Sequence, residues 1–463
     1  MSTAASNSPS LKSDPLREIS LRIAVIGAGL VGSFITVALS RLPGVKVVTF
    51  EKASKPHEAG AWISLSVTGL KVLTKLIPAS EVSAIAYRPP DRGVYVTRHW
   101  KTGEVIIKRY SSEDLKDEHI QARTHREPLL KLILKQIPDG IIRYGHKVTG
   151  VRVESARASL TIEEDHATRG RSQSPETFDL VVAADGIYSG IRRQFFPDHQ
   201  VGYKGAVAYR AIFPTSRLAA IRTRLHDDSS LWTNNRGQMV FLSELGLGMY
   251  GVVIIQAEES KRAAGLMWEH SIGGEGLDEL RQCYAAWDPI VVEVLAVLED
   301  IQAYPLDSGP WLEHLSREGC VAFVGDAAHP TAGAYGAGAA MGFGDGWALA
   351  RALEESQLAL EGSCQYNVHK ALDIYEKIRR PFLARVEQQM GLDARNSRYV
   401  GEADGEEWVR RYLERNPLNL WLSEHDVELE TQKVIMELAF MPNGHTSRER
   451  GGEKSISDCV MIH

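Results

Sequence analysis

The chain of 463 residues is long enough for two or three domains with an ample core. Its 44% hydrophobic and 24% charged residues are typical of a water-soluble globular protein, and a net charge of −6 without a basic block argues against a nucleic-acid partner. Four scattered cysteines without a Cys-x-x-Cys pair suit a reducing compartment, and no apolar run approaches the ~18 residues of a membrane span. We therefore expect a cytoplasmic protein without membrane contact.

The two ends of the chain, residues 1–19 and 442–463, are polar and predict disordered tails. The first of them lacks the apolar centre of a signal peptide, which again indicates the cytoplasm.

The first predicted unit is a strand, a glycine-rich turn, a helix and a second strand, which occupy Leu21–Ile26, Gly27–Gly32, Leu30–Leu42 and Lys46–Phe50. In such a unit Gly27 makes the tight turn, and Gly29 lets a pyrophosphate approach the helix N-terminus. Gly32 permits close packing of the helix on the strand, and Glu51, at the end of the second strand, is placed to accept hydrogen bonds from an adenosine ribose. The unit predicts dinucleotide binding.

A second match to the same glycine pattern lies at Gly246–Gly251. It is followed by the β-branched run Val252–Ile255, so no helix N-terminus is available to bind a phosphate. We predict a hairpin turn there, and therefore a single dinucleotide-binding unit in the chain.

The remaining predicted elements follow in chain order: an amphipathic helix at 120–137, strands at 146–154, 159–164 and 177–185, an all-strand region at 201–256, and helical regions at 276–300 and 365–435. We find no metal-binding pattern such as His-Glu-x-x-His. No internal repeat is present.

The stretch "VGDAAHPTAGAYGAGAAMG" at 324–342 lies between a strand-like run at 320–324 and a helix-like run at 347–353. Its many Gly and Ala residues let backbone N–H groups approach a ligand closely. The stretch is thus a second candidate for ligand contact.

Three motifs now stand in order: the Gly27–Gly32 turn, "DLVVAADGIYSGIRR" at 179–193 and "GDAAHP" at 325–330. With them the chain resembles the FAD-dependent aromatic monooxygenases of the para-hydroxybenzoate hydroxylase type. Within that family it is similar to the fungal salicylate-hydroxylase-like branch, which includes dearomatising polyketide hydroxylases. The resemblance implies non-covalently bound FAD and NADPH or NADH as a transient reductant.

The resemblance also implies an α/β fold, in which a mostly antiparallel β-sheet substrate domain is inserted into a Rossmann-like FAD-binding domain and a helical region follows. We expect the FAD-binding domain at 20–75, 120–200 and 315–390, the substrate domain at 76–119 and 201–314, and C-terminal helices at 391–441. The expected assembly is a monomer or a homodimer.

Several residue roles are implied by the same resemblance. Asp185 and Gly186 are expected near the FAD pyrophosphate, with a link to NAD(P)H handling. Arg126, which follows His125, is expected to reach the phosphate and ribityl region. Asp326 is expected to hydrogen-bond the ribityl chain, and Pro330 to lie near the flavin carbon that reacts with oxygen.

The second loop is expected to serve the isoalloxazine ring. Reduced flavin is an anion at N1 and C2=O, and backbone N–H groups at a helix start stabilise such a charge. By resemblance this role falls to the amides of Gly336, Ala337, Gly338 and Ala339. The chain departs from the family at 64–73, which lacks the usual Pro-Asn, and at 344–345, where Gly-Asp replaces Glu-Asp.

Arg210 lies on a predicted strand at 206–213, on the same side as Ala208 and Ile212 and among small and apolar neighbours. A charge in that setting is costly unless something pairs with it. By resemblance we take Arg210 as the anchor of a substrate phenolate; a structural salt bridge is the alternative.

Two further residue types are candidates for the site. Tyr95, Tyr110 and Tyr250 can each reach a substrate or belong to the core, and we take Tyr250 with Arg210 and Pro330 as the catalytic candidates. For His329 the sequence indicates a hydrogen bond within its loop rather than catalysis.

The resemblance implies a monooxygenase that uses NAD(P)H and O₂ to hydroxylate an electron-rich phenol through a flavin hydroperoxide. Dearomatisation or decarboxylation can follow from the same attack, and the expected setting is fungal polyketide metabolism. A salicylate-type catabolic hydroxylase is the first alternative. More distant alternatives are a flavin halogenase, whose W-x-W-x-I-P pattern is absent, and a non-catalytic flavoprotein that docks through 408–430.

Overall fold

The N-terminal unit forms the centre of a parallel sheet. The structure is a computed structural model that describes residues 20–56, 62–164, 176–263, 270–360, 363–398, 407, 411 and 420–440. Strand β1 (Leu21–Ile26) pairs in parallel with β2 (Val45–Glu51), and α1 (Leu30–Ser40) connects them. The helix ends before Pro43 as predicted, because proline cannot continue a helix.

The main sheet has six strands in the order β18-β19-β11-β1-β2-β7. Its other strands are β7 (Ile142–Tyr144), β11 (Leu180–Ala183), β18 (Ser316–Arg317) and β19 (Val321–Phe323). β1 has β2 on one side and β11 on the other, so the strand order reverses at β1. The glycine turn after β1 therefore lies at a switch point, where open α/β sheets bind their ligands.

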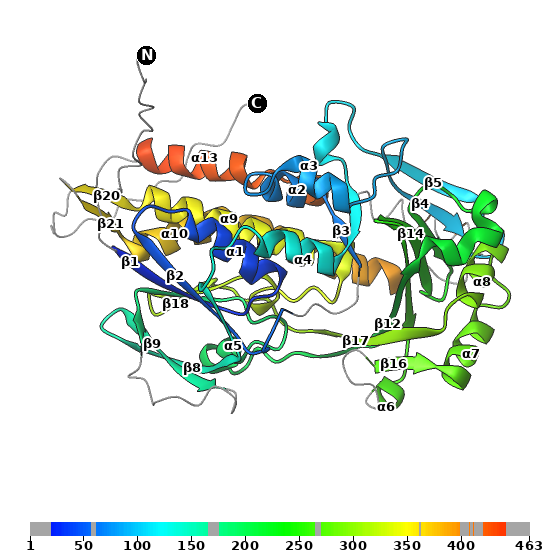
Figure 1. Ribbon diagram of the computed structural model, residues 1–463, viewed down its shortest axis with the longest axis horizontal. Helices are drawn as coiled ribbons and strands as arrows, with labels where there is room; N and C mark the ends of the chain where they lie inside the picture. The colour runs from blue at the N-terminus through cyan, green and yellow to red at the C-terminus, as the bar shows by residue number, and fades with distance from the viewer. Residues whose placement is uncertain are drawn as a thin grey trace, which may run out of the picture.

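Helices α1, α4 (Arg126–Leu134), α9 (Gly338–Glu355) and α10 (Val368–Arg398) form a layer beside this sheet (Figure 1). Two glycines of α9 allow it to lie close to α1. A Cβ on Gly342 would lie 2.5 Å from Cγ2 of Val31, and one on Gly346 would overlap the side chain of Ile35. These two glycines thus serve helix packing rather than ligand contact.

A second, eight-stranded sheet lies on the right in Figure 1, in the order β16-β17-β12-β15-β14-β13-β4-β5. Its strands are β4 (Gly93–His99), β5 (Val105–Tyr110), β12 (Gly202–Pro214), β13 (Ser230–Thr233), β14 (Met239–Gly246), β15 (Met249–Ala257), β16 (His270–Gly273) and β17 (Asp300–Ser308). All neighbours are antiparallel except β13 and β4. With the six-stranded sheet, this arrangement confirms the predicted fold class.

One face of the eight-stranded sheet carries a second hydrophobic core. It packs against η3 (Thr215–Arg224), α7 (Gly274–Cys283) and α8 (Pro289–Ala296). β4 and β5 fall within 76–119 and the remaining strands within 201–314, the two segments predicted for the substrate domain. The domain boundaries themselves stay a prediction.

Smaller elements complete the described fold. They are β3 (Trp62–Leu65) paired with β6 (Ala122–His125), the sheet of β8 (His146–Glu154), β9 (Arg157–Glu164) and β10 (Thr177–Phe178), the hairpin of β20 (Gln357–Leu360) and β21 (Ser363–Tyr366), and the short helices α2 (Val67–Leu73), α3 (Ala79–Ile85), η1 (Asp117–His119), α5 (Gly190–Phe195), α6 (Ser260–Ala263), η4 (Gly325–Ala327) and η5 (Ala334–Gly336).

Several predicted elements are wrong in part. The helix predicted for 120–137 is strand β6 followed by α4, because β6 pairs with the distant strand β3. The helical region 276–300 is two helices, and Asp288 caps the second by accepting from the backbone of Ile290 at 2.9 Å. The all-strand region contains η3, and the region 365–435 begins in β21.

The second glycine pattern is a hairpin turn, as predicted. β14 ends at Gly246 and β15 begins at Met249. The two residues between them, Leu247 and Gly248, have φ of +53° and +69°. Two successive positive φ angles are typical of a tight hairpin between twisted strands.

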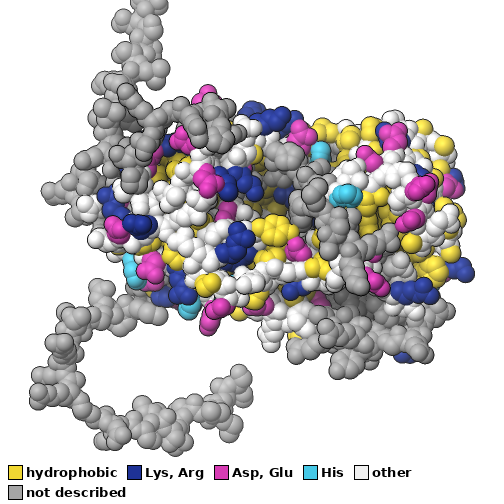
Figure 2. Space-filling model, turned by 90° about the horizontal axis from the view of Figure 1, so that it is seen from below, with side chains coloured by type: hydrophobic (Ala, Val, Ile, Leu, Met, Phe, Trp, Pro, Cys, Tyr) yellow, Lys and Arg dark blue, Asp and Glu magenta, His cyan; other side chains and the backbone are white. Residues whose placement is uncertain are grey.

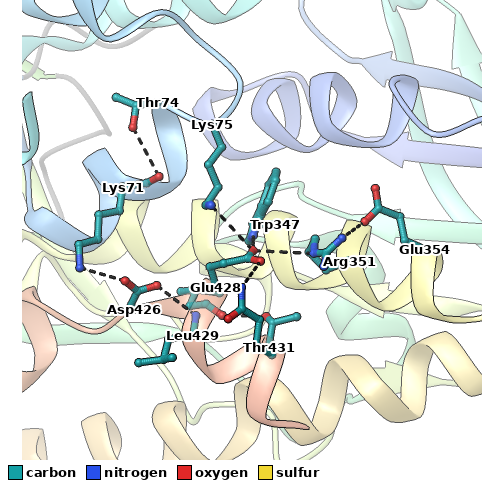
Figure 3. A network of polar contacts seen from close by, with 12 residues as sticks. Lys71, Thr74, Lys75, Trp347, Arg351, Glu354, Asp426, Glu428, Leu429 and Thr431 are labelled. Atoms are coloured by element: carbon teal, nitrogen blue, oxygen red, sulfur yellow. Dashed lines mark hydrogen bonds and ion pairs between the residues drawn. The ribbon is translucent and has the colours of Figure 1, made fainter. Parts of the chain in front are cut away.

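The described C-terminal segment comprises α12 (Leu420–Ser423) and α13 (Val427–Phe440). Glu428 accepts from Nε1 of Trp347 at 2.6 Å, and Asp426 pairs with Lys71 at 2.9 Å (Figure 3). These contacts fasten α13 to α9 and α2. The described part of the 408–430 segment is therefore packed against the fold, whereas 1–19 and 441–463 lie outside the described residues.

On the face seen in Figure 2, basic and acidic side chains of the described residues are interspersed. Among the described helices, none combines the length and the apolar character that crossing a membrane requires.

Candidate active site

The first glycine turn has the geometry that a dinucleotide requires. Gly27 has φ +98°, and a Cβ there would lie 2.6 Å from the carbonyl oxygen of Ala184. A Cβ on Gly32 would overlap the carbonyl oxygen of Gly27. Both positions exclude a side chain, the first through the turn and the second through the close approach of α1.

The N-terminus of α1 is open toward this turn. Gly29 is its N-cap and provides no side-chain hydrogen bond. Glu51 lies beside it, because its two carboxylate oxygens accept from the backbone N–H groups of Ala28 at 2.7 Å and Ala53 at 2.8 Å. A helix N-terminus of this kind suits a phosphate group. The contact of Glu51 with a ribose stays a prediction.

The second motif lies directly against the first. Cα of Asp185 is 3.2 Å from the position of a Cβ on Gly27. Oδ2 of Asp185 accepts from the backbone of Gly190 at 2.9 Å and so caps α5, while Oδ1 is buried without a partner in the described residues. Burial raises the pKa of this carboxyl. Gly186 has φ +79°, and the space that a Cβ would occupy there is open.

The third motif is tied to the second through Arg192. Its Nη1 donates to the carbonyl oxygens of Asp326 at 2.9 Å and Ala327 at 3.2 Å. Burial raises the pKa of the Asp326 carboxyl, while His329, Arg126 and Arg192 act in the opposite direction. The fold thus gathers all three motifs at the ends of β1, β11 and β19.

A buried ion cluster holds the third motif in place. Oδ2 of Asp345 accepts from the backbone of Gly325 at 2.8 Å and lies 2.6 Å from Nε2 of His329, and Oδ1 accepts from Nε of Arg379 at 2.8 Å. His329 therefore makes a structural hydrogen bond, but its partner lies on α9 and not within its own loop as predicted. Sequence reasoning missed Arg379. The available signal was Asp345 on the helix that follows the loop, because a carboxylate that becomes buried requires a cation.

The start of α9 lies beside this motif. Ala337 is the N-cap of α9 and makes no side-chain hydrogen bond, and Gly336 has φ +60°. A Cβ on Gly338 would lie 3.6 Å from Oδ1 of Asp326, so the helix start faces that carboxyl. The backbone N–H of Gly336 donates to the carbonyl oxygen of Gly333 at 3.1 Å. The amides at this helix start that suit an anion are therefore those of Ala337, Gly338 and Ala339, and the role expected of the Gly336 amide stays a prediction.

Arg210 is brought to the same place. Its Nη2 lies 3.9 Å from the position of a Cβ on Gly333, and its Cζ is 5.0 Å from the ring centroid of Tyr304. Burial and then the neighbouring charge of Arg126 lower its pKa to about 10. Within the described residues Arg210 forms no ion pair with a carboxylate, so the salt-bridge alternative finds no support there. Its role as an anchor stays a prediction.

Of the other two catalytic candidates, Pro330 lies in the third motif and Tyr250 lies apart from the three motifs. The Pro330 carbonyl oxygen accepts from Oγ of Ser308 at 2.7 Å and Nε1 of Trp311 at 3.1 Å, which fixes the loop. Tyr250 pairs with Phe213 and lies in the second core, on the face opposite Arg210. The structure thus places Tyr250 away from Arg210, because the side of a strand on which a residue lies depends on the register.

Aromatic residues that sequence reasoning missed lie on the Arg210 face. Phe241 is the cross-strand neighbour of Val253, which in turn pairs with Arg210. The Phe241 ring is 6.1 Å from that of Trp62 and 6.5 Å from that of Tyr95. Only the register of four strands reveals this group.

These features fit a dinucleotide that carries a diphosphate and, at its other end, a ring system that becomes anionic. They are the two open helix starts, the two positions that exclude a side chain (Gly27 and Gly32) and the cations Arg126 and Arg210. The first two motifs suit the diphosphate half. The third motif and the start of α9 suit the ring.

Comparisons with known proteins agree with this geometry. The family model described as "FAD binding domain" matches residues 20–390. The chain is 28% identical over 344 residues to 6-hydroxynicotinate 3-monooxygenase of Pseudomonas fluorescens, which covers 72% of this chain and 83% of the relative. It is 25% identical over 435 residues to 6-methylsalicylate 1-monooxygenase of Aspergillus terreus, with 89% and 91% covered.

A solved structure of a salicylate hydroxylase substrate complex has a TM-score of 0.70 at 21% identity, with 90% of this chain and 98% of that chain covered. This likeness concerns the fold. The chain belongs to the family of FAD-binding-domain proteins, and it is an FAD-dependent aromatic monooxygenase.

Proposed function

We propose that this enzyme hydroxylates an electron-rich phenolic ring that is bound as the phenolate by Arg210. The observation that carries the proposal is the half-buried guanidinium of Arg210 beside Gly333, without a carboxylate partner in the described residues. A cation withdrawn from water is costly when nothing offsets its charge, and an anionic ring offsets it. The names of the relatives above, which include a hydroxynicotinate and a methylsalicylate, support a hydroxylated aromatic substrate.

The residues of the site have separate tasks in this proposal. Arg126 reaches the phosphate and ribityl region of the cofactor, Asp326 binds its ribityl chain, and the start of α9 holds the isoalloxazine ring. Arg210 orients the phenolic ring of the substrate and keeps it ionised. FAD, when bound, supplies reduction by NAD(P)H and the transfer of one oxygen atom from O₂. The loop around Pro330, fixed through Ser308 and Trp311, gives the ring a rigid neighbour.

From the family resemblance we take an aromatic polyketide as the source of the ring, with dearomatisation or hydroxylation as the outcome. The relative from Aspergillus terreus, whose name gives a methylsalicylate as substrate, supports a second candidate, a salicylate-type acid, for which we propose an oxidative decarboxylation. The two differ in whether carbon dioxide is released and in whether the product keeps its aromatic absorbance.

The test is NAD(P)H oxidation by the purified yellow protein across a panel of phenols, salicylates and resorcylic aldehydes. We expect one class to stimulate oxidation strongly and to gain one oxygen atom by mass spectrometry, with little hydrogen peroxide released. Carbon dioxide release identifies the decarboxylation. If no phenol stimulates oxidation, the proposed substrate class is wrong.

A further inference from the structure

A second group of buried cations lies away from Arg210. Arg109 on β5 is 6% exposed, and its Nε and Nη1 are buried without a hydrogen-bond partner among the described residues. Arg123 on β6 is 1% exposed; it donates from Nη2 to the carbonyl oxygen of Val94, while its Nε and Nη1 have no acceptor in the described chain. Neither guanidinium forms an ion pair with a carboxylate of the described residues.

Tyr95 is close to both of these cations. Cζ of Arg109 is 5.3 Å from the Tyr95 ring centroid, and the charges of Arg109 and Arg123 oppose the burial that raises the pKa of the Tyr95 hydroxyl. The buried Nε1 of Trp62, across the Phe241 ring from Tyr95, also has no described partner. We call Arg109, Arg123 and Tyr95 the Arg109 cluster.

Arg109, Tyr95 and Arg210 share one face of the eight-stranded sheet. Arg123 lies on β6, outside that sheet, and contacts it through the carbonyl oxygen of Val94 on β4. Residues that pair directly on neighbouring strands lie on the same face, and so do residues two apart along one strand. The pairs from β12 to β4 are Arg210–Val253, Val253–Phe241, Phe241–Leu231 and Leu231–Thr97. Tyr95 lies two residues before Thr97 on β4, and it pairs with Arg109 on β5. Five strand spacings of about 4.8 Å separate the two backbones by roughly 24 Å. Long arginine side chains shorten the distance between the two charged groups, and Phe241 lies between them.

Two buried guanidiniums near one tyrosine, neither of which forms an ion pair with a carboxylate of the described residues, destabilise the free protein, and the more distant charge of Asp228 offsets that of Arg123 only in part. Burial lowers the pKa of Arg109, and it lowers that of Arg123 to about 10. An oxyanion that accepts their free N–H groups removes this cost, and a carboxylate has the geometry for several such hydrogen bonds. A phosphate group of the reductant NADPH could accept the same hydrogen bonds, so the test must distinguish a substrate carboxylate from a phosphate of the reductant.

We propose that the Arg109 cluster binds a carboxylate at the far end of the substrate, while the phenolic ring of the same molecule lies at Arg210. The inference rests on the proposed function and deepens it. It assigns the substrate to a class of phenols that carry an acidic group on an extended chain. The intervening aromatic residues, Phe241 and Trp62, then line the path of the chain.

The experiment uses the FAD-loaded enzyme and follows the change in flavin absorbance on titration. The probes are 3-hydroxyphenyl alkanoic acids of increasing chain length and their primary amides. We expect one of the longer acids to bind at least about tenfold more tightly than its amide, and Arg109→Gln to bring that ratio close to one. Lys108→Met is the matched control, because Lys108 lies next in the strand and pairs with Asp91 at 2.5 Å. It should keep the preference.

Three results would overturn the inference. The first is that the wild-type enzyme binds no acid more tightly than its amide at any chain length, a measurement that requires no variant. Another is an unchanged preference in folded Arg109→Gln. The third is a raised KM for NADPH in that variant with the acid preference intact, which would assign the oxyanion to the reductant. In each case simple phenols would still stimulate NAD(P)H oxidation. That assay tests the proposed function, whereas the acid-to-amide ratio tests only the carboxylate site.

Discussion

His329 and Asp345 are joined inside the protein: Nε2 of His329 lies 2.6 Å from Oδ2 of Asp345, and both side chains are buried. Arg379 on α10 binds the other oxygen of the same carboxylate at 2.8 Å. One aspartate of α9 therefore fixes the loop after β19 and a neighbouring helix at once. The position of Asp326 and Pro330 depends on that loop.

Asp345→Asn should destabilise the protein by ~3–5 kcal/mol, because it leaves the buried charge of Arg379 without a partner. Urea unfolding of the FAD-loaded protein measures the loss. The control is Asp373→Asn, since Asp373 forms an exposed pair with His369 at 3.3 Å. That change should cost under about 0.5 kcal/mol. Equal losses in the two variants would contradict the role given to the ion cluster.

The contribution of Asp345 should depend on pH in one direction. Burial opposes its ionisation, but His329 and Arg379 hold the pKa of Asp345 at about 2, below the ordinary value of 3.8. A carboxyl whose pKa is lowered in the folded state stabilises the fold at pH values above its ordinary pKa. This contribution to stability is lost as the pH falls toward 2. The difference in unfolding free energy between the wild type and Asp345→Asn should therefore narrow from about pH 5 downward. A constant difference would speak against it.

Asp326→Asn should weaken FAD binding and yet stabilise the protein without FAD. Burial raises the pKa of Asp326, and such a group costs stability as the pH rises above its ordinary pKa, with the full cost reached above the raised folded pKa. Loss of a charge-assisted hydrogen bond should weaken FAD binding by ~1.5–3 kcal/mol. FAD titration of the apoprotein and its thermal midpoint at neutral pH test the two halves. Asp198→Asn, at an exposed position, should change neither.

Gly29→Val should abolish FAD retention while the chain stays folded, because a side chain at the open N-terminus of α1 meets the pyrophosphate. Absorbance of the purified protein and circular dichroism measure the two properties. Gly202→Val is a suitable control, because no atom lies within 4 Å of a Cβ at that strand position. Full FAD occupancy in folded Gly29→Val would refute the assignment of the first glycine turn.

Arg210→Lys should keep the fold and FAD but reduce kcat/KM by at least about a hundredfold, because lysine cannot present two parallel donors. The apparent pKa of the bound phenol should rise, which its absorbance reports. Arg217→Lys, at a surface pair with Glu299, should leave both unchanged. Near-normal turnover with a lowered thermal midpoint would instead show that Arg210 is structural.

Local sequence determined the first unit of the fold. β1 spans the predicted residues, and α1 and β2 agree with the prediction within two residues, because turn glycines and the Pro43-Gly44 break act on their immediate neighbours. The hairpin at Gly246 was predictable for the same reason, since the β-branched run after it excludes a helix. The three glycine-containing motifs were also sufficient to predict the protein family from the sequence.

Tertiary structure alone decided which distant residues meet. β6 became a strand because Trp62–Leu65 pairs with it, and Asp345 stays ionised because Arg379 approaches from another helix. Strand register placed Tyr250 in a core and Arg109 on the face of Arg210. Periodicity shows that residues alternate along a strand, but only the pairing of strands far apart in the chain decides which side is buried.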